Sequence, residues 1–151
     1  EAPPTPGRDP LRLAGHGPFH TPLMVGSSDK AKAELSASLF GNPAIPMVDG
    51  RGHIWRRFAS DPADMWDYTF GHQILAPYDF ALSVQVAVRE FAPDVVILPG
   101  PGDTLGGAIA QALIGIEWQG IAGKADFMAR QAADPILLSM GRAEQRALVT
   151  G

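Results

Sequence analysis

The spacing of apolar and polar residues predicts helices in the first half of the chain. Thr21 and Pro22 are typical of a helix start, with threonine as the N-cap and proline at the first helical position. Gly41-Asn42-Pro43 is typical of the end of such a helix. In chain order we expect a short strand over 11–13, a helix over about 21–40, a strand over 44–48, a loop over 51–61 and a helix from 61 to 77.

The second half contains the pattern of a strand, a turn and a helix. Residues 94–98 form the clearest strand signal, because an unbroken run of Val, Ile and Leu is typical of a strand covered on both faces. A turn with two glycines follows, and Asp103 would cap a helix that reaches about Ile114. This unit predicts an α/β fold with a short, mostly parallel sheet and flanking helices.

Residues 80–92 fit both the alternation of a strand and one face of a helix. We predict a helix, because the run is long and Asp79 is a suitable N-cap. Residues 122–133 also favour a helix, and the remainder is expected to be a tail packed on the surface.

Composition and charge narrow the class of protein. The 151 residues suffice for one domain, and a net charge of −4 argues against a general nucleic-acid binder, which needs a basic face. The lack of cysteine excludes disulfides, thiolate metal sites and a cysteine nucleophile. No apolar run approaches the roughly 18 residues of a membrane helix, so we expect no membrane association and a cytoplasmic location.

The chain begins with Glu rather than Met, and residues 1–9 are rich in proline. We expect a flexible leader there. The first residue indicates a processed chain, a trimmed chain or a partial reading frame.

The residues with the most chemical information are 17–24, Gly-Pro-Phe-His-Thr-Pro-Leu-Met. His20 lies at the end of a glycine-rich loop and just before a helix start, where a side chain is held while its ring stays reachable. Imidazole can accept and return a proton, as general acid–base catalysis requires. Considered by this chemistry alone, a single histidine before a helix is more often a structural or surface residue.

Residues 17–24 resemble the histidine motif of malonyl-CoA:acyl carrier protein transacylases and of polyketide synthase acyltransferase domains. The resemblance implies that His20 deprotonates a serine and later protonates the leaving thiol. Residues 73–80, Gln-Ile-Leu-Ala-Pro-Tyr-Asp-Phe, are similar to a second segment of that family. They imply that the main-chain carbonyl of Gln73 orients His20; the alternative is that Gln73 simply ends a helix before Pro77.

A third similarity is the glycine-rich loop after the strand at 94–98. The family pattern is Gly-Pro-Gly-x-x-Leu-x-Gly, and the matching residues are Gly100, Pro101, Gly102, Leu105 and Gly107. The resemblance implies a structural loop near the active-site wall. A glycine-rich turn before a helix can also bind phosphate, but the carboxylate of Asp103 would repel that anion.

Phe19 is the one residue that bears on the acyl group. In polyketide acyltransferases a phenylalanine before the histidine accompanies malonyl, because its ring leaves less room for an α-methyl group. The resemblance therefore places Phe19 in the substrate pocket. The alternative is an aromatic side chain that anchors the loop.

The family's nucleophile motif, Gly-x-Ser-x-Gly, is absent from the 151 residues. The oxyanion loop and the arginine that binds the malonyl carboxylate are absent too. The resemblance therefore implies the C-terminal part of the large α/β-hydrolase-like subdomain, over residues 10–115, with residues 116–151 as a helical extension. The serine would lie on a missing N-terminal half, and the chain alone would be inactive.

The implied activity is transfer of malonyl, or a similar acyl group, from coenzyme A to acyl carrier protein through an acyl-serine ester, in fatty acid or polyketide synthesis. The implied partners are acyl carrier protein, malonyl-CoA and the missing half, with no cofactor. We expect no metal, since His16, His53 and His72 match no ligand spacing with His20.

Two alternatives remain open. The chain could be a non-catalytic remnant that binds acyl carrier protein or a partner subunit, or a thioesterase-like hydrolase module. For the leading interpretation, a half domain would expose apolar surface where the missing part packs and could self-associate through it, unless the tail covers that surface.

Overall fold

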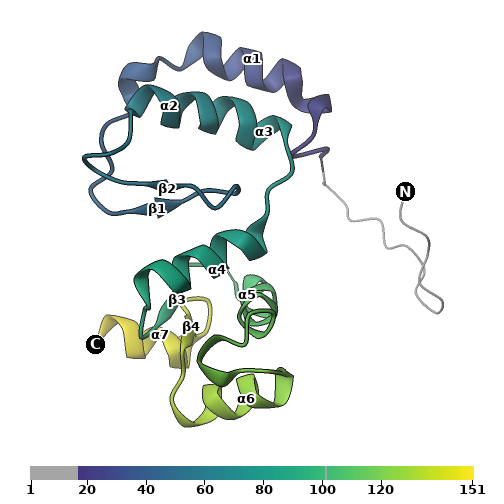
Figure 1. Ribbon diagram of the computed structural model, residues 1–151, viewed down its shortest axis with the longest axis vertical. Coiled ribbons are helices and arrows are strands. Elements are labelled where there is room, and N and C mark those ends of the chain that lie inside the picture. The colour runs from purple at the N-terminus through teal and green to yellow at the C-terminus, as the bar shows by residue number, and fades with distance from the viewer. Residues whose placement is uncertain (1–16, 101) are drawn as a thin grey trace, which may run out of the picture. The chain divides into compact units, whose positions relative to one another are not determined.

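The computed structural model describes residues 17–100 and 102–151 (Figure 1). The expected leader over 1–9, the expected strand over 11–13 and Pro101 lie outside the described residues. The chain divides into two compact units. The described part of the first comprises 17–40 and 63–77, and the second comprises 41–62 and 78–151.

The first unit is helical. A 3-10 turn at Pro22–Met24 precedes α1 (Val25–Glu34), and a second 3-10 turn follows at Ala37–Leu39. The expected continuous helix over about 21–40 is therefore wrong at both ends. Leu35 is extended, and its carbonyl accepts a hydrogen bond from Trp66 Nε1 at 2.6 Å, which takes that carbonyl out of the helical ladder.

Thr21 also departs from the expected capping role. Its side chain makes no N-cap hydrogen bond, and its hydroxyl donates instead to the carbonyl of Pro18 at 2.7 Å. Threonine hydroxyls often bond to nearby main chain in this way, which stabilises a turn rather than a helix end.

The second helical stretch, which lies in this unit from Ala63 onward, runs between two prolines, as expected. It comprises α2 (Pro62–Asp67), a π-helical turn (Tyr68–His72) and α3 (Gln73–Leu75). Figure 1 shows α1 lying beside α2 and α3. The hydroxyl of Ser28 donates to the carbonyl of Phe70 at 2.5 Å, and the ammonium of Lys32 pairs with Asp67. These two contacts hold α1 against the π-helical turn.

The second unit begins with a hairpin. Strands β1 (Met47–Val48) and β2 (Ile54–Trp55) pair antiparallel, with Met47 opposite Trp55. The expected loop over 51–61 is thus wrong where β2 lies. The buried carboxylate of Asp49 accepts hydrogen bonds from the main-chain N–H groups of Arg51 and His53, and these bonds close the turn that returns the chain.

The helix expected over 80–92 is confirmed as α4 (Phe80–Phe91), and the side chain of Asp79 caps it by accepting from Leu82 N at 2.8 Å. The expected strand is present as β3 (Val96–Leu98), followed by α5 (Leu105–Ile114). The helix expected near 122–133 is α6 (Lys124–Ala133).

The expected surface tail after residue 133 is wrong. Residues Leu137–Ser139 form β4, which pairs parallel with β3, and α7 (Ala143–Thr150) follows. Ile136 is 1 % exposed. An apolar strand in the core buries more apolar area away from water than it would in a tail packed on the outside of the protein.

Asp103 does not cap α5. Thr104 occupies the N-cap position without a side-chain hydrogen bond, and the carboxylate of Asp103 instead pairs with the Arg142 guanidinium at 2.5 Å. Asp103 therefore pairs with Arg142, which is distant in sequence, instead of with an N–H group at the start of α5.

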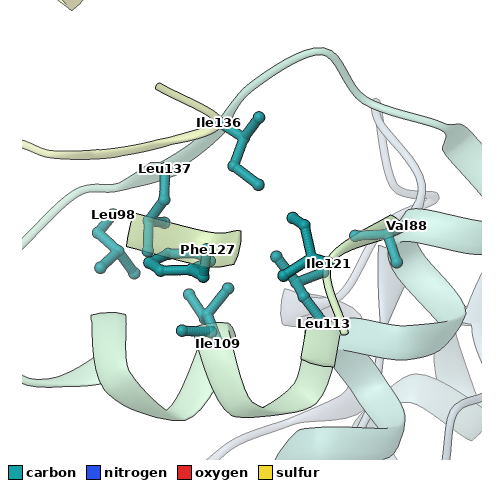
Figure 2. Packing of buried hydrophobic residues seen from close by; sticks show 9 residues of the cluster. Val88, Leu98, Ile109, Leu113, Ile121, Phe127, Ile136 and Leu137 are labelled. Atoms are coloured by element: carbon teal, nitrogen blue, oxygen red, sulfur yellow. The ribbon is translucent and has the colours of Figure 1, made fainter. Parts of the chain in front are cut away.

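The core of the second unit lies where α4, α5 and α6 meet the parallel strand pair. Leu113 is fully buried at its centre, beside Val88 and Ile121. Figure 2 shows Phe127 beside Leu137, with Ile109 of α5 facing them. The described chain is thus α/β and mostly helical, but its strands form two separate pairs, one antiparallel and one parallel, instead of one mostly parallel sheet.

Candidate functional site

His20 and Gln73 lie in contact within the first unit, although 53 positions separate them in the sequence. The distance from Nδ1 of the His20 ring to the main-chain oxygen of Gln73 is 2.6 Å. The ring is half-buried. This is the pair that the resemblance implies, and the structure gives its geometry.

The hydrogen bond determines which ring nitrogen carries the proton. A carbonyl oxygen can only accept, so Nδ1 of a neutral His20 must carry the hydrogen and Nε2 must carry the lone pair. The arrangement therefore makes Nε2 the atom that can accept a proton from another group.

The Gln73 carbonyl can accept a hydrogen bond from His20 because α3 ends at Leu75. In an α-helix this oxygen would accept from the N–H four residues later, and that residue is Pro77, which has none. Proline also disfavours helical geometry at the residue before it, and Ala76 is extended, with φ −123° and ψ 155°. Pro77 thus leaves the carbonyl of Gln73 available for His20.

The backbone of His20 is strained. Its φ is +59°, in the left-handed region that non-glycine residues rarely adopt. Such a conformation costs about 1–3 kcal/mol and persists where the surroundings hold it, often at functional sites. Here the Gln73 contact holds the ring, and the hydrogen bond from Thr21 to Pro18 holds the loop.

Phe19 precedes His20 and is 58 % exposed. Its ring lies over Gly17, where an added Cβ would be 3.1 Å from Cζ of Phe19. The structure thus shows a ring anchored on the loop that also presents apolar surface next to His20. Its assignment to a substrate pocket stays a prediction.

Contacts that the sequence did not indicate support the segment carrying Gln73. Tyr68 and His72 stack within the π-helical turn, with ring centroids 5.8 Å apart. Lys32 of α1 lies over the Trp66 ring at 5.5 Å and is ion-paired with Asp67. Lys32 is 35 positions from Asp67 and matches no motif with it, so only the packing of α1 against this segment reveals these contacts.

The glycine-rich loop belongs to the second unit, whereas His20 belongs to the first. Gly100 and Gly102 have φ of +99° and +83°, which glycine adopts without strain. The carbonyl of Gly102 accepts from the Ser139 hydroxyl, so the loop is tied to the end of β4. Leu105 is 51 % exposed, and Gly107 lies on α5 with open space at its Cβ position.

The other histidines form no metal site in the part of the chain that the structure describes, where no three potential ligands gather. His53 packs edge-on against Trp55, and His72 stacks on Tyr68. His16 lies outside the described residues.

Arg51 and Arg56 lie on the hairpin of the second unit and are ion-paired. Arg51 binds the carboxylate of Asp49 at 2.7 Å, and Arg56 pairs with Glu90 of α4. These pairs give both arginines a structural partner.

None of the helices in residues 17–100 and 102–151 combines the length and apolar character needed to cross a bilayer. Comparison of the chain with models of protein families, with curated proteins and with solved structures finds no match.

Proposed function

We propose that His20 is the general base of an acyltransferase that moves malonyl, or a similar acyl group, from coenzyme A to the thiol of acyl carrier protein. The observation that carries the proposal is the 2.6 Å contact between Nδ1 of His20 and the Gln73 carbonyl, which directs the basic Nε2 away from that carbonyl. The proposal is supported by three segments that resemble one acyltransferase family and follow one another along the chain in the same order as in that family. We also propose that the chain forms part of an α/β-hydrolase-like subdomain.

The first half-reaction moves one proton out and back. Nε2 of His20 takes the proton of a serine hydroxyl while the serine oxygen attacks the thioester carbonyl of acyl-coenzyme A. When the carbon–sulfur bond breaks, the imidazolium returns the proton to the coenzyme A thiolate. The product is an acyl-serine ester and free coenzyme A.

The second half-reaction follows the same path with a new nucleophile. Nε2 of His20 takes the proton of the carrier protein's thiol, and the thiolate attacks the serine ester. The imidazolium then protonates the departing serine oxygen. The Gln73 carbonyl stabilises the imidazolium in both halves, as a carboxylate does in serine proteases.

The nucleophilic serine is proposed to lie on a segment outside these 151 residues, because no Gly-x-Ser-x-Gly occurs among them. The side chain of Phe19 would border the acyl group and disfavour an α-methyl substituent. The 151 residues by themselves should show no acyl transfer, since the base then has no nucleophile to activate.

The test is to read the coding sequence upstream of Glu1, express the complete open reading frame and measure malonyl transfer to acyl carrier protein. His20→Ala should lower the rate by about 100- to 10,000-fold, the usual contribution of a general base. His53→Ala is the matched control and should leave the rate unchanged. Transfer that survives His20→Ala, or an equal rate from the 151 residues alone, would refute the proposal.

The missing nucleophile motif also favours a second candidate, a non-catalytic module that binds acyl carrier protein. In that case the 151-residue chain should capture acyl carrier protein equally well with and without His20→Ala. Upstream sequence that encodes no serine motif would put this candidate first.

A further inference from the structure

A cavity of about 450 Å³ lies in the second unit, beside the carboxyl ends of the parallel strands β3 and β4. Helices α5 and α6 contribute most of its remaining wall. This volume is within the range of about 300–1,000 Å³ typical of small-molecule sites. The cavity lies wholly within one compact unit, and its lining contains neither His20 nor Gln73.

The floor of the cavity is apolar. Leu98, Leu137 and Phe127 line it, and each is less than a tenth exposed. Figure 2 shows these three side chains gathered together. On α5 the lining residues Gly107 and Ala110 are small, and a Cβ at Gly107 would meet nothing within 4 Å. The small residues therefore leave space for an apolar group of a ligand.

Two polar side chains in the wall are already satisfied by the protein. The Gln131 amide bonds to both the N–H and the carbonyl of Leu137, and the Ser139 hydroxyl bonds to the carbonyl of Gly102 and to the N–H of Gly141. These bonds to the main chain hold the wall in place.

The rim supplies donors and positive charge. Lys124 lines the cavity and forms no ion pair with any residue in the described part of the chain. Gln145 accepts from Ser139 N through Oε1, which leaves its amide Nε2 as a donor. Lys124 and Arg142 are two positive charges against the one negative charge of Asp103, so the lining carries a net charge of +1.

We infer that this cavity binds a small organic carboxylate with a compact apolar body. The body would lie on Leu98, Phe127 and Leu137, and the carboxylate would meet the ammonium of Lys124 and the amide of Gln145. One uncompensated charge suits a monoanion, while the Asp103 carboxylate disfavours ligands with several phosphates. Within the described residues Lys124 has no ion-pair partner, and it lies at an apolar cavity although the chain has a net charge of −4. This combination favours an anion with an apolar body as the ligand.

The test is a titration of the 15N-labelled 151-residue chain with hexanoate, followed by amide NMR shifts. Hexanamide, which lacks the charge, and hexylamine, which reverses it, are the ligand controls. We expect saturable shifts with hexanoate that map to α5, α6 and β4, and weaker or no shifts with the two controls. Absence of saturable shifts, or equal binding of all three compounds, would overturn the inference.

Two pairs of variants locate the site. Lys124→Gln should weaken hexanoate binding about fivefold, the upper range for an exposed ion pair, while Arg89→Gln on α4 removes a charge away from the lining and should have no effect. Gly107→Phe should abolish binding by filling the cavity, while Gly107→Ala should preserve it. Circular dichroism checks that each variant is folded, and unchanged affinity in a folded Lys124→Gln refutes the inference by itself.

Discussion

Replacing Pro77 with alanine should weaken the hold of the Gln73 carbonyl on the His20 ring. Alanine supplies an N–H four residues after Gln73, so α3 can extend and give that carbonyl a competing donor. A hydrogen bond contributes about 0.5–1.5 kcal/mol net, which corresponds to a factor of about 2–13 in an equilibrium. The ratio of the Nδ1–H to the Nε2–H tautomer should fall by up to that factor.

The assay is long-range 1H–15N NMR of 15N-histidine-labelled chain at about pH 8.5, two units above the ordinary histidine pKa. Gln73→Ala is the matched control, because it removes the side chain and keeps the main-chain carbonyl that His20 contacts. We expect the control to resemble the wild type. An unchanged tautomer ratio in Pro77→Ala would refute the argument that proline reserves this carbonyl.

Two further predictions concern the second unit. Leu113→Ala should lower the free energy of unfolding by about 2–5 kcal/mol in urea titrations, because Leu113 is fully buried, whereas Leu105→Ala on the same helix should cost far less, since Leu105 is 51 % exposed. Burial raises the pKa of Asp49, but its polar contacts lower that pKa by more. These contacts are hydrogen bonds from the Arg51 side chain and from the N–H groups of Arg51 and His53, together with the positive charge of Arg51. The pKa of Asp49 therefore lies below its ordinary value of 3.8. The stabilisation from this carboxylate is therefore present above pH 3.8 and is lost as the pH falls through the pKa of the folded state. Asp49→Asn should be less stable near neutral pH and should lose less stability as the pH falls below 3.8. An identical acid profile for variant and wild type would contradict this reasoning.

Local patterns predicted the elements whose causes are local. Helix α4 was predicted because its N-cap, Asp79, directly precedes it and bonds to the N–H of Leu82, three residues later. Strand β3 was predicted because a continuous apolar run can be recognised without knowing its partner strand. The segment from Pro62 to Leu75 was bounded correctly because proline acts on its immediate neighbours.

The errors lie where a distant residue decides the local structure. The end of α1 depends on Trp66, which bonds to the carbonyl of Leu35, and β4 becomes a strand because it pairs with β3 about 40 positions earlier. Asp103 turns from a capping residue into the partner of Arg142 for the same reason. Strands of two or three residues have almost no periodicity, so sequence alone could not identify β2 and β4 as strands.

The candidate site divides in the same way. The sequence by itself determined that a histidine follows a glycine-rich loop, that a proline stands four residues after Gln73, and that no Gly-x-Ser-x-Gly is present. Only the tertiary structure decided the 2.6 Å contact, the left-handed backbone of His20 and therefore the ring nitrogen that carries the proton. It alone also placed Lys124 at an apolar cavity. The physical reason is that a hydrogen-bond partner or a cavity wall depends on distances between residues remote in sequence, and packing determines those distances.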